Sequence, residues 1–538
     1  MRAALAFSDL RRPLRRWPWP SLAVVAGLTA LCLALPTANP TGDAWYYAAC
    51  ARWGHELAQP HHLLYNSVGW AWLRLVGATG PAPAGLVALP WLQALNALAF
   101  GGCLLALAGL LRRAGVAAAA VPAWLLLVGS CYGMLRFATE NETYIQPLLL
   151  ALLASQAWGR AIGLPARRMG GLLLAGTLAA LACLLHQLMV WWWLGLLLGL
   201  RPWQSPRALR GTLAYLLPAG LVPLAYAWVL LGQGQPLGLG SLLRFALHDY
   251  VAGGAQVSIG FKSLLLTAIN LVRTAGQVHG NLLPLLRHWP LALGTVALAC
   301  FALGIYAVLG LRVSTAKLRL NTAPGAPPAA ALVRRTHGVI FLLHLLFAAQ
   351  AAGNAEFMVM LPALAALAGA GGALAAWAPR RVAALGAALL GWNLTFGLVP
   401  AHRLVYTDAG AALRARVRAQ PRAWFLLLDP NLLRNQLHYY TSQPVGPPRV
   451  AGAPALWAQR PGQSPASFRA WLATRLAAGD TVYTDALGGY QPLDRAQLAL
   501  AYDNAALLKD FEQVKTDSFP TFFGPRYLTQ LRPATRPN

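Results

Sequence analysis

The sequence is dominated by long apolar segments. Runs of 16 to 25 apolar residues recur along the first 400 positions and are separated by short basic clusters. Backbone N–H and C=O groups in hydrocarbon have no water to pair with, so segments of this length must form helices. With 57% hydrophobic and only 11% charged residues, the chain is predicted to be an α-helical polytopic membrane protein.

The apolar runs predict eleven transmembrane helices. Residues 189–200 and 339–352 are short for a hydrocarbon layer of about 30 Å and also fit re-entrant segments, so the count could change by two. The first run also resembles a cleaved signal peptide, but the topology requires it as a span. The predicted spans cover residues 21–36, 86–111, 116–135, 145–158, 170–185, 189–200, 213–231, 291–311, 339–352, 357–377 and 382–399.

The basic residues predict the orientation of the chain. Twenty of the 27 Lys and Arg residues before position 401 lie in clusters at residues 2–16, 112–113, 160–168, 201–210, 312–335 and 380–381. The positive-inside rule is obeyed throughout if all these clusters are cytoplasmic, which places the N-terminus inside and the C-terminus outside. The net charge of +27 is thereby explained by the lipid bilayer, without a nucleic-acid partner.

The composition changes at residue 401. The last 138 positions contain 16 basic and nine acidic residues, and the apolar runs become short. Residues 424–428 and 481–484 are predicted strands, and residues 432–441 and 467–478 are predicted helices. The sequence therefore predicts a membrane domain over residues 1–400 and a small α/β extracytoplasmic domain over residues 401–538.

Acidic residues gather on one side of this predicted topology. The first 400 residues contain seven carboxylates, and all except Asp9 fall in outer loops or at outer ends of spans. The first outer loop, residues 37–85, also contains His55, His61 and His62. Ionisable groups at such positions are candidates for function. The six outer carboxylates are Asp43, Glu56, Glu140, Glu142, Asp249 and Glu356.

Three short motifs carry a family resemblance. They are GDAWYY, which contains Asp43; QPHHLLYN, which contains His61, His62 and Tyr65; and TENETY, which contains Glu140, Glu142 and Tyr144. With these motifs, the span count and the external tail, the chain resembles the GT-C glycosyltransferases. More narrowly, it resembles the bacterial branch related to protein mannosyltransferases and the lipid A aminoarabinose transferase. It differs in having His-His where many relatives have His-Pro.

The resemblance implies a function. Such enzymes transfer a hexosyl or pentosyl group, with inversion, from a polyprenyl-phosphate sugar to an acceptor at the outer face of the bacterial inner membrane. The fold alone does not establish this chemistry. Sugar transfer needs a base for the acceptor proton, cations for the departing phosphate and a site open to lipid.

Two carboxylates are the candidate catalytic residues. Asp43 is the preferred base, since desolvation at a membrane edge raises the pKa of a carboxylate toward a useful value; the alternative is a helix-capping role. Glu142, with Tyr144 nearby, is the preferred second acid, although a solvated loop end fits equally well. Glu140 and Glu142 cannot share one helix face, so we expect at most one in the cavity. Asp43 with either glutamate could bind Mg²⁺ or Mn²⁺, but this signal is not specific.

Other outer residues are candidates for substrate binding. His61 and His62 could contact the donor phosphate or orient Asp43, with one of them expected to be structural because neighbours on a helix diverge. His186 is either a ligand or a packing residue. Glu356 is either a donor contact or an interfacial charge. Phosphate neutralisation could come from the outer cations Arg136, Arg244, Lys262 and Arg273.

The main alternative function is a lipid-sugar flippase or a small-solute transporter. Such a protein should have ionisable residues near the centres of its spans and two repeated halves, and neither is evident in the sequence. A scaffold with a membrane anchor would not require eleven spans. There is no P-loop, GxGxxG, HExxH or GxSxG motif, and the six cysteines show no ligand spacing, so nucleotide, metalloprotease and hydrolase-triad chemistry lack support.

Overall fold

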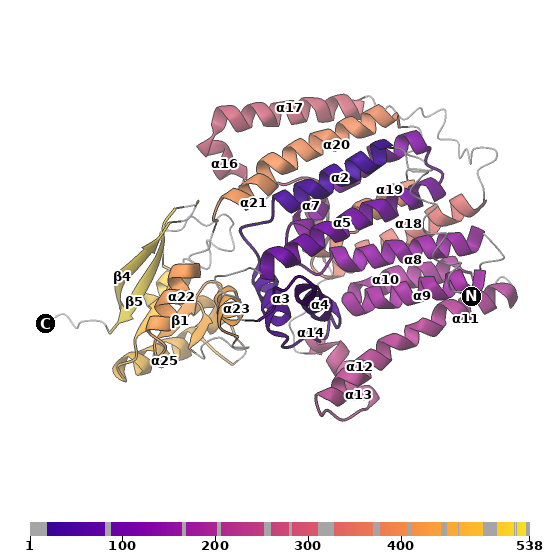
Figure 1. Cartoon of the computed structure of the whole chain (residues 1–538). Helices are drawn as coiled ribbons and strands as arrows, with labels where there is room; N and C mark the ends of the chain where they lie inside the picture. The colour runs from indigo at the N-terminus through magenta and orange to yellow at the C-terminus, as the bar shows by residue number, and fades with distance from the viewer. Residues whose placement is uncertain are drawn as a thin grey trace.

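The chain folds into a helical bundle followed by a smaller mixed domain, in a computed structural model (Figure 1). The long helices lie side by side, and the C-terminal domain covers one end of the bundle. The structure describes residues 19–80, 88–163, 168–201, 206–251, 260–278, 282–309, 328–369, 377–406, 410–442, 449–460, 462–487, 503–520, 522 and 524–533.

The bundle contains helices of very different lengths. The longer ones are α2 (Trp19–Ala34), α5 (Ala88–Arg113), α8 (Ile145–Gly163), α9 (Arg168–Leu185), α17 (Pro290–Leu309), α18 (Pro328–Gln350) and α20 (Pro379–Asn393). Shorter segments complete the bundle: η3 (Ala118–Ala120), α6 (Val121–Gly129), α7 (Tyr132–Ala138), η5 (Gln187–Met189), α10 (Val190–Gly199), α11 (Pro206–Leu216), η7 (Leu217–Gly220), α12 (Leu221–Gly232), α19 (Leu361–Gly369), η11 (Leu394–Leu398) and α21 (Val399–Arg403).

Several short helices lie at the end of the bundle that faces the C-terminal domain (Figure 1). Two of them, α3 (Gly42–Trp53) and α4 (Tyr65–Leu75), come from the predicted first outer loop. The others are α13 (Leu239–Ala246), α14 (His248–Val251), α15 (Phe261–Ala275), α16 (Leu282–His288) and η9 (Ala355–Met358).

Each of the eleven predicted spans contains helix in the structure, but their lengths differ. Six helices of the described chain are long and apolar enough to cross a membrane, or seven if the bent pair α6–α7 is one span. Residues 19–34, 187–199 and 355–369 are shorter apolar helices. The protein is therefore a multi-pass helical membrane protein, and the count of eleven stays a prediction.

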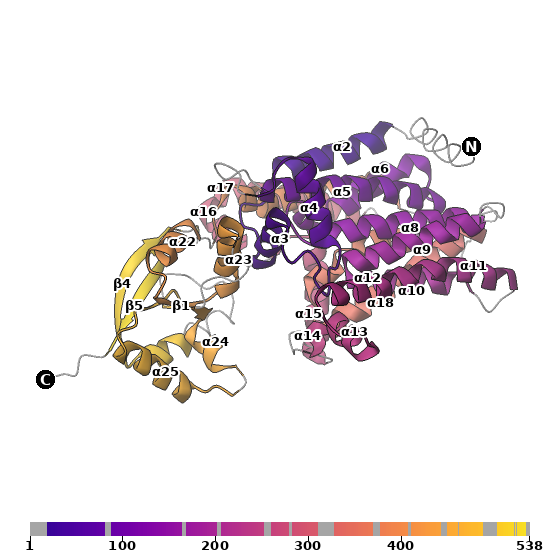
Figure 2. The ribbon, with the colours of Figure 1, turned by 60° about the horizontal axis from the view of Figure 1, so that its bottom comes forward.

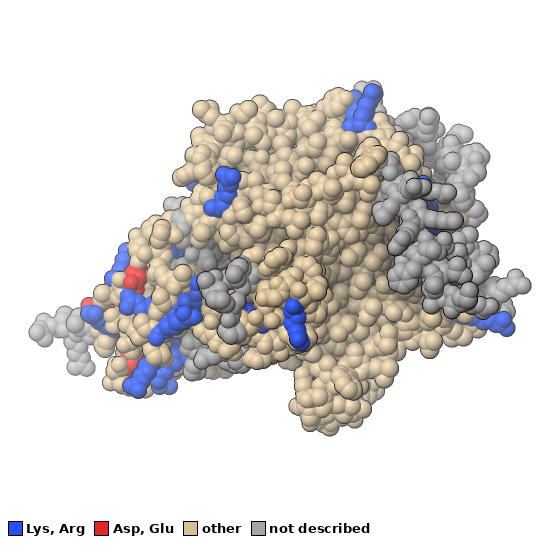
Figure 3. All heavy atoms as spheres, viewed as in Figure 1, with Lys and Arg blue, Asp and Glu red and all other residues tan. Residues whose placement is uncertain are grey.

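The surface of the bundle fits a lipid environment. Figure 3 shows Lys and Arg gathered over the C-terminal domain, whereas the face of the bundle in this view is almost free of charge. Helix α17 exposes Leu291, Leu298 and Leu309. Exposed apolar area on this scale would be unfavourable in water and is normal in a bilayer.

A broken helix shapes the region that contains the acidic motif. The axis of α7 is bent by 71° from that of α6. The break leaves backbone N–H and C=O groups without helical partners. Asn393 of α20 is fully buried and donates from Nδ2 to the carbonyls of Ser130 (2.7 Å) and Ala275 (2.9 Å). Its Oδ1 accepts the N–H of Gln277 at 2.7 Å. One buried amide thus satisfies the break, as irregular backbone at membrane depth requires, and ties α7 to α15.

The C-terminal domain contains a five-stranded mixed sheet in the order β2-β1-β3-β5-β4. Strands β1 (Trp424–Leu427), β2 (Val450–Gly452) and β3 (Val482–Thr484) are parallel, and the antiparallel strands β4 (Glu512–Phe519) and β5 (Arg526–Arg532) extend the sheet. Its helices are α22 (Gly410–Ala419), α23 (Pro430–Thr441), α24 (Pro454–Ala458) and α25 (Pro465–Ala477). The two predicted strands and two predicted helices are present as β1, β3, α23 and α25.

Helix α23 packs directly against α3 and joins the two parts of the molecule (Figures 1 and 2). Asn435 donates to the carbonyl of Gly42 at 2.8 Å, and Arg52 donates to the carbonyl of Tyr439 at 3.2 Å. The rings of Trp45 and Tyr439 meet edge to face, with centroids 5.0 Å apart. The first outer loop is therefore held between the bundle and the C-terminal domain.

Candidate active site

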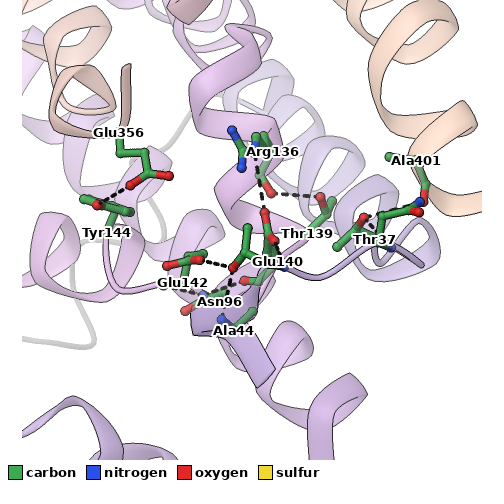
Figure 4. Close-up of polar contacts among 12 residues, drawn as sticks. Thr37, Ala44, Asn96, Arg136, Thr139, Glu140, Glu142, Tyr144, Glu356 and Ala401 are labelled. Atoms are coloured by element: carbon green, nitrogen blue, oxygen red, sulfur yellow. Dashed lines mark hydrogen bonds and ion pairs between the residues drawn. The ribbon is translucent and has the colours of Figure 1, made fainter. Parts of the chain in front are cut away.

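The start of α3 is bonded to the acidic motif at the end of α7 (Figure 4). The backbone N–H of Thr41 donates to Glu140 Oε1 at 2.9 Å, and the Thr41 hydroxyl donates to Glu142 Oε1. The same hydroxyl accepts the N–H of Ala44 at 3.0 Å and so caps α3. Thr41 is the residue that connects the first and second acidic motifs.

Thr41→Val should show how much this connection contributes. The variant keeps the side-chain volume but loses both hydroxyl bonds, and a lost N-cap alone costs about 1 to 2 kcal/mol. We expect a lower thermal unfolding temperature in detergent, whereas Thr41→Ser, which keeps the hydroxyl, should resemble the wild type. Equal unfolding temperatures for the valine and serine variants would show that the hydroxyl has no structural role.

The acidic motif itself is fixed by buried amides. Asn96 of α5 is fully buried and donates to the carbonyls of Glu140 (2.7 Å) and Glu142 (2.8 Å). Asn141 donates to the carbonyl of Ala44 at 2.9 Å and accepts the Tyr65 hydroxyl at 3.0 Å. The two glutamates are thus presented by a rigid, non-helical loop. Because the loop is not helical, each glutamate lines a different cavity.

The first of these, the Asp43 cavity, brings together most of the predicted site residues. It has a volume of about 680 Å³. Of the predicted residues, its wall includes Asp43, His61, His62, Glu142, Tyr144, His186 and Glu356. It is completed by Tyr46, Tyr47, Gln59, Pro60, Thr143, Gln187, Leu188, Phe245, His248, Phe347 and Phe357.

Asp43 is an exposed residue of the first turn of α3 and faces this cavity. The predicted alternative, a helix-capping aspartate, is not what the structure shows, because Thr41 occupies the N-cap. The first turn of a helix favours a negative charge. Asp43 is therefore an exposed carboxylate in the wall of the cavity.

Glu142 has a different environment from Asp43. It is only 5% exposed. Burial raises the pKa of Glu142 well above its usual value, and the negative charges of Glu140 and Glu356 raise it further. Glu142 therefore keeps its proton to higher pH than an ordinary glutamate.

The histidines of the first outer loop contact the turn between α9 and η5. His61 Nδ1 lies 3.1 Å from Gln187 Oε1, and the carbonyl of His61 accepts the N–H of Gln187 at 3.1 Å. The rings of His62 and His186 are 4.4 Å apart. This segment is not helical, and both His61 and His62 line the cavity. The helical divergence expected of these neighbours does not apply, and the role of each histidine stays a prediction.

A second cavity, the Arg136–Arg273 cavity, lies on the other side of the acidic motif. Its volume is about 260 Å³, and two arginines from different helices line it together with Glu140. Arg136 Nε lies 3.4 Å from Glu140 Oε2, and Arg273 donates to Asn270 at 2.7 Å. The rest of the wall is Thr37, Asn39, Tyr132, Thr139, Gln277, Gly397, Leu398, Ala401 and Tyr406. Two guanidinium groups at one cavity suit an anionic group.

Three predicted binding residues lie outside both cavities. Arg244 and Lys262 are exposed and line neither cavity. The structure therefore does not bring them together with the predicted acidic residues. Tyr65 is 3% exposed, and its hydroxyl donates to the acidic loop. Tyr65 therefore supports the site from behind and does not face the cavity.

Two histidines lie within α18, and one of them, His344, is inside the predicted span 339–352, so the expectation that no ionisable residue lies near the centre of a span is wrong. His337 and His344 are fully buried. His337 lies 3.0 Å from Ser155 Oγ, and the His344 ring packs against Trp192. Neither residue lines either of the two cavities, so they pack the bundle and do not extend the site.

A divalent cation would require several oxygen or nitrogen ligands at one point. Within the described residues, no group of three or more His, Cys, Asp and Glu side chains is arranged to hold a metal ion. The predicted Mg²⁺ or Mn²⁺ site therefore stays a prediction, and no step below depends on it.

Several residues that build the site were not predicted from the sequence. Thr41 and Asn141 stand next to predicted residues, and only the three-dimensional contacts reveal their roles. Asn96 had a usable signal, because an amide inside an apolar run of a predicted span must find partners.

Comparisons with known proteins identify the fold. No protein-family model matches the sequence, and no curated protein does. Among solved structures, the oligosaccharyltransferase of Archaeoglobus fulgidus in complex with Zn and sulfate matches with a TM-score of 0.50 and 14% identity, over 94% of this chain and 72% of that one. This is the GT-C glycosyltransferase fold.

Two further structures with the GT-C fold match over most of this chain. The apo form of the same oligosaccharyltransferase has a TM-score of 0.50 and 13% identity, over 95% of this chain and 74% of that one. ArnT from Cupriavidus metallidurans in the apo state has a TM-score of 0.40 and 14% identity, over 98% of both chains. The two oligosaccharyltransferase matches, at identities this low, show a shared fold and leave the activity to be argued from the site.

Proposed function

We propose that the protein is a glycosyltransferase that moves a sugar from a polyprenyl-phosphate donor to an acceptor. The observation that supports this most directly is the pairing of two cavities on either side of one fixed acidic loop. One cavity offers the open carboxylate of Asp43, and the other offers Arg136 and Arg273. A base and a cationic phosphate site are the two components that this reaction requires.

The proposed reaction is a single displacement. Asp43 takes the proton of an acceptor hydroxyl, whose oxygen forms a bond to the anomeric carbon of the sugar. The bond between that carbon and the phosphate oxygen breaks, and polyprenyl phosphate leaves with the electron pair. Arg136 and Arg273 stabilise the charge of the departing phosphate. One displacement inverts the configuration at the anomeric carbon.

The surroundings of both cavities suit a substrate carried by a lipid. Helix α13 places Phe245 in the Asp43 cavity and exposes Leu239 and Leu243. Helix α15 places Arg273 in the second cavity and exposes Phe261 and Leu264. Each helix therefore has a polar or cavity-facing side and an apolar side, as expected at the edge of a bilayer.

The orientation is proposed from the positive-inside rule. Both cavities would then open at the outer face of a bacterial inner membrane, with the C-terminal domain outside. Helix α23, which contacts α3 next to Asp43, would face an acceptor arriving from the aqueous side.

The proposed function is tested with purified protein in detergent. A panel of undecaprenyl-phosphate hexoses and pentoses is incubated with protein and a total membrane extract as the acceptor source, and released undecaprenyl phosphate is measured. We expect release to depend on both protein and donor. Absence of release with every donor, from protein that unfolds cooperatively, would contradict the proposal. The same assay in EDTA, with and without added Mn²⁺, tests the predicted divalent cation: loss of release that Mn²⁺ restores would support it, and unchanged release would contradict it.

The transporter alternative is less well supported by the site. The ionisable groups of both cavities gather around the acidic loop, and Figure 4 shows Arg136, Glu142 and Glu356 at this loop. The two histidines of α18 are packed among other side chains and line neither cavity. A transport path would instead need polar groups that continue across the bilayer.

A further inference from the structure

His186 has an unusual hydrogen-bonding arrangement in the Asp43 cavity. It lies between α9 and η5 and is only 6% exposed. Its Nδ1 accepts the backbone N–H of Leu188 at 3.1 Å. A ring nitrogen that accepts a hydrogen bond has no proton, so the proton of this imidazole is on Nε2. The Leu188 N–H therefore selects a single tautomer.

The protonated nitrogen is left without a partner. Nε2 of His186 is buried and has no hydrogen-bond partner among the described residues. Buried donors are nearly always satisfied, so one that is not calls for an explanation. Because His186 is part of the cavity wall, the simplest explanation is a ligand oxygen that occupies this position when substrate is bound.

The chemistry of the wall indicates which oxygen this is. None of the described residues lining the Asp43 cavity is Lys or Arg, and the ring of Tyr144 lies 5.1 Å from that of His186. Burial, and then the neighbouring His62, lower the pKa of His186. A neutral N–H donor beside aromatic rings suits a hydroxyl oxygen of a sugar, whereas a phosphate would be drawn to the two arginines of the other cavity.

We propose that His186 is a specificity-determining residue that donates its Nε2–H to a hydroxyl oxygen of the transferred sugar. The Asp43 cavity thus holds the sugar of the donor, and the Arg136–Arg273 cavity holds its phosphate. This inference rests on the proposed function. It adds that the sugar and the phosphate of one donor molecule occupy different cavities.

Two substitutions separate this role from a structural one. His186→Asn keeps an acceptor near the Nδ1 position, which can still cap Leu188, but removes the donor at Nε2. His186→Gln does the opposite, because its amide N–H reaches the Nε2 position. We expect His186→Asn to bind the preferred undecaprenyl-phosphate sugar roughly tenfold more weakly, the size of one lost hydrogen bond. His186→Gln should stay within about threefold of the wild type. A histidine that only caps the turn would give the reverse order.

Binding of bare undecaprenyl phosphate is the matched control. Both His186 variants should bind it as the wild type does, because it has no sugar. Deoxy analogues of the preferred donor identify the hydroxyl that His186 contacts. The wild type should bind one analogue roughly tenfold more weakly than the full donor. His186→Asn should bind that analogue and the full donor with equal affinity, because its hydrogen bond is already lost. Equal binding of every donor by wild type and His186→Asn would overturn the inference while the proposed function stands. Failure of the wild type to bind any sugar-linked donor would overturn both.

Discussion

Asp43→Asn is expected to abolish sugar transfer while the protein still folds. Asparagine has nearly the same shape and fits the first turn of α3, but its amide cannot take a proton from an acceptor hydroxyl. Loss of a general base costs about 10² to 10⁴ in rate. The initial rate of undecaprenyl phosphate release, measured beside the thermal unfolding temperature, separates a catalytic defect from a folding defect.

The first outer loop offers a matched control for this substitution. Glu56 is an exposed carboxylate of the same loop that accepts the Tyr46 hydroxyl at 2.6 Å and does not line the Asp43 cavity. Glu56→Gln should therefore retain most of the transfer rate. If Asp43→Asn released undecaprenyl phosphate nearly as fast as the wild type, Asp43 would have no part in the reaction.

Arg273→Gln should weaken binding of the lipid phosphate. The substitution removes one of the two guanidinium groups of the Arg136–Arg273 cavity and keeps a polar side chain that can contact Asn270. A hydrogen bond to a charged group contributes about 1.5 to 3 kcal/mol, which corresponds to roughly 10- to 150-fold in affinity. The dissociation constant for bare undecaprenyl phosphate measures this directly.

Helix α15 provides the control for charge alone. Lys262 is on the same helix, loses the same charge when changed to Gln, and is exposed outside both cavities. Lys262→Gln should leave the dissociation constant nearly unchanged, since exposed charges act weakly at physiological salt. Equal losses in the two variants would mean that the positive charge of α15, and not the cavity, attracts the phosphate.

The apolar pattern of the sequence predicted the helical bundle well. Long hydrocarbon-length runs have few alternatives to helix, so every predicted span contains one. The bend between α6 and α7 was not predictable, because its stability depends on Asn393, an amide from a helix more than 250 residues away.

The sequence indicated which residues form the candidate site, but it did not indicate how they are arranged in space. The acids and histidines stood out because ionisable groups are rare in such a chain. Sequence spacing could not show that Glu140 and Glu142 line different cavities, since that follows from a non-helical loop held by Asn96. Nor could it select Arg136 and Arg273 from the four outer cations, because α7 and α15 meet only in the folded bundle.

The packing of α23 on α3 has a practical consequence for genetic experiments. A chain cut before Gly410 would lose Tyr439 and its neighbours and would leave Trp45 of α3 facing water. Such a truncation would then lose activity because the segment that carries Asp43 becomes disordered, even if the removed part had no contact with any substrate. The C-terminal domain cannot be treated as a detachable module, and its role has to be studied by point substitutions in the intact chain.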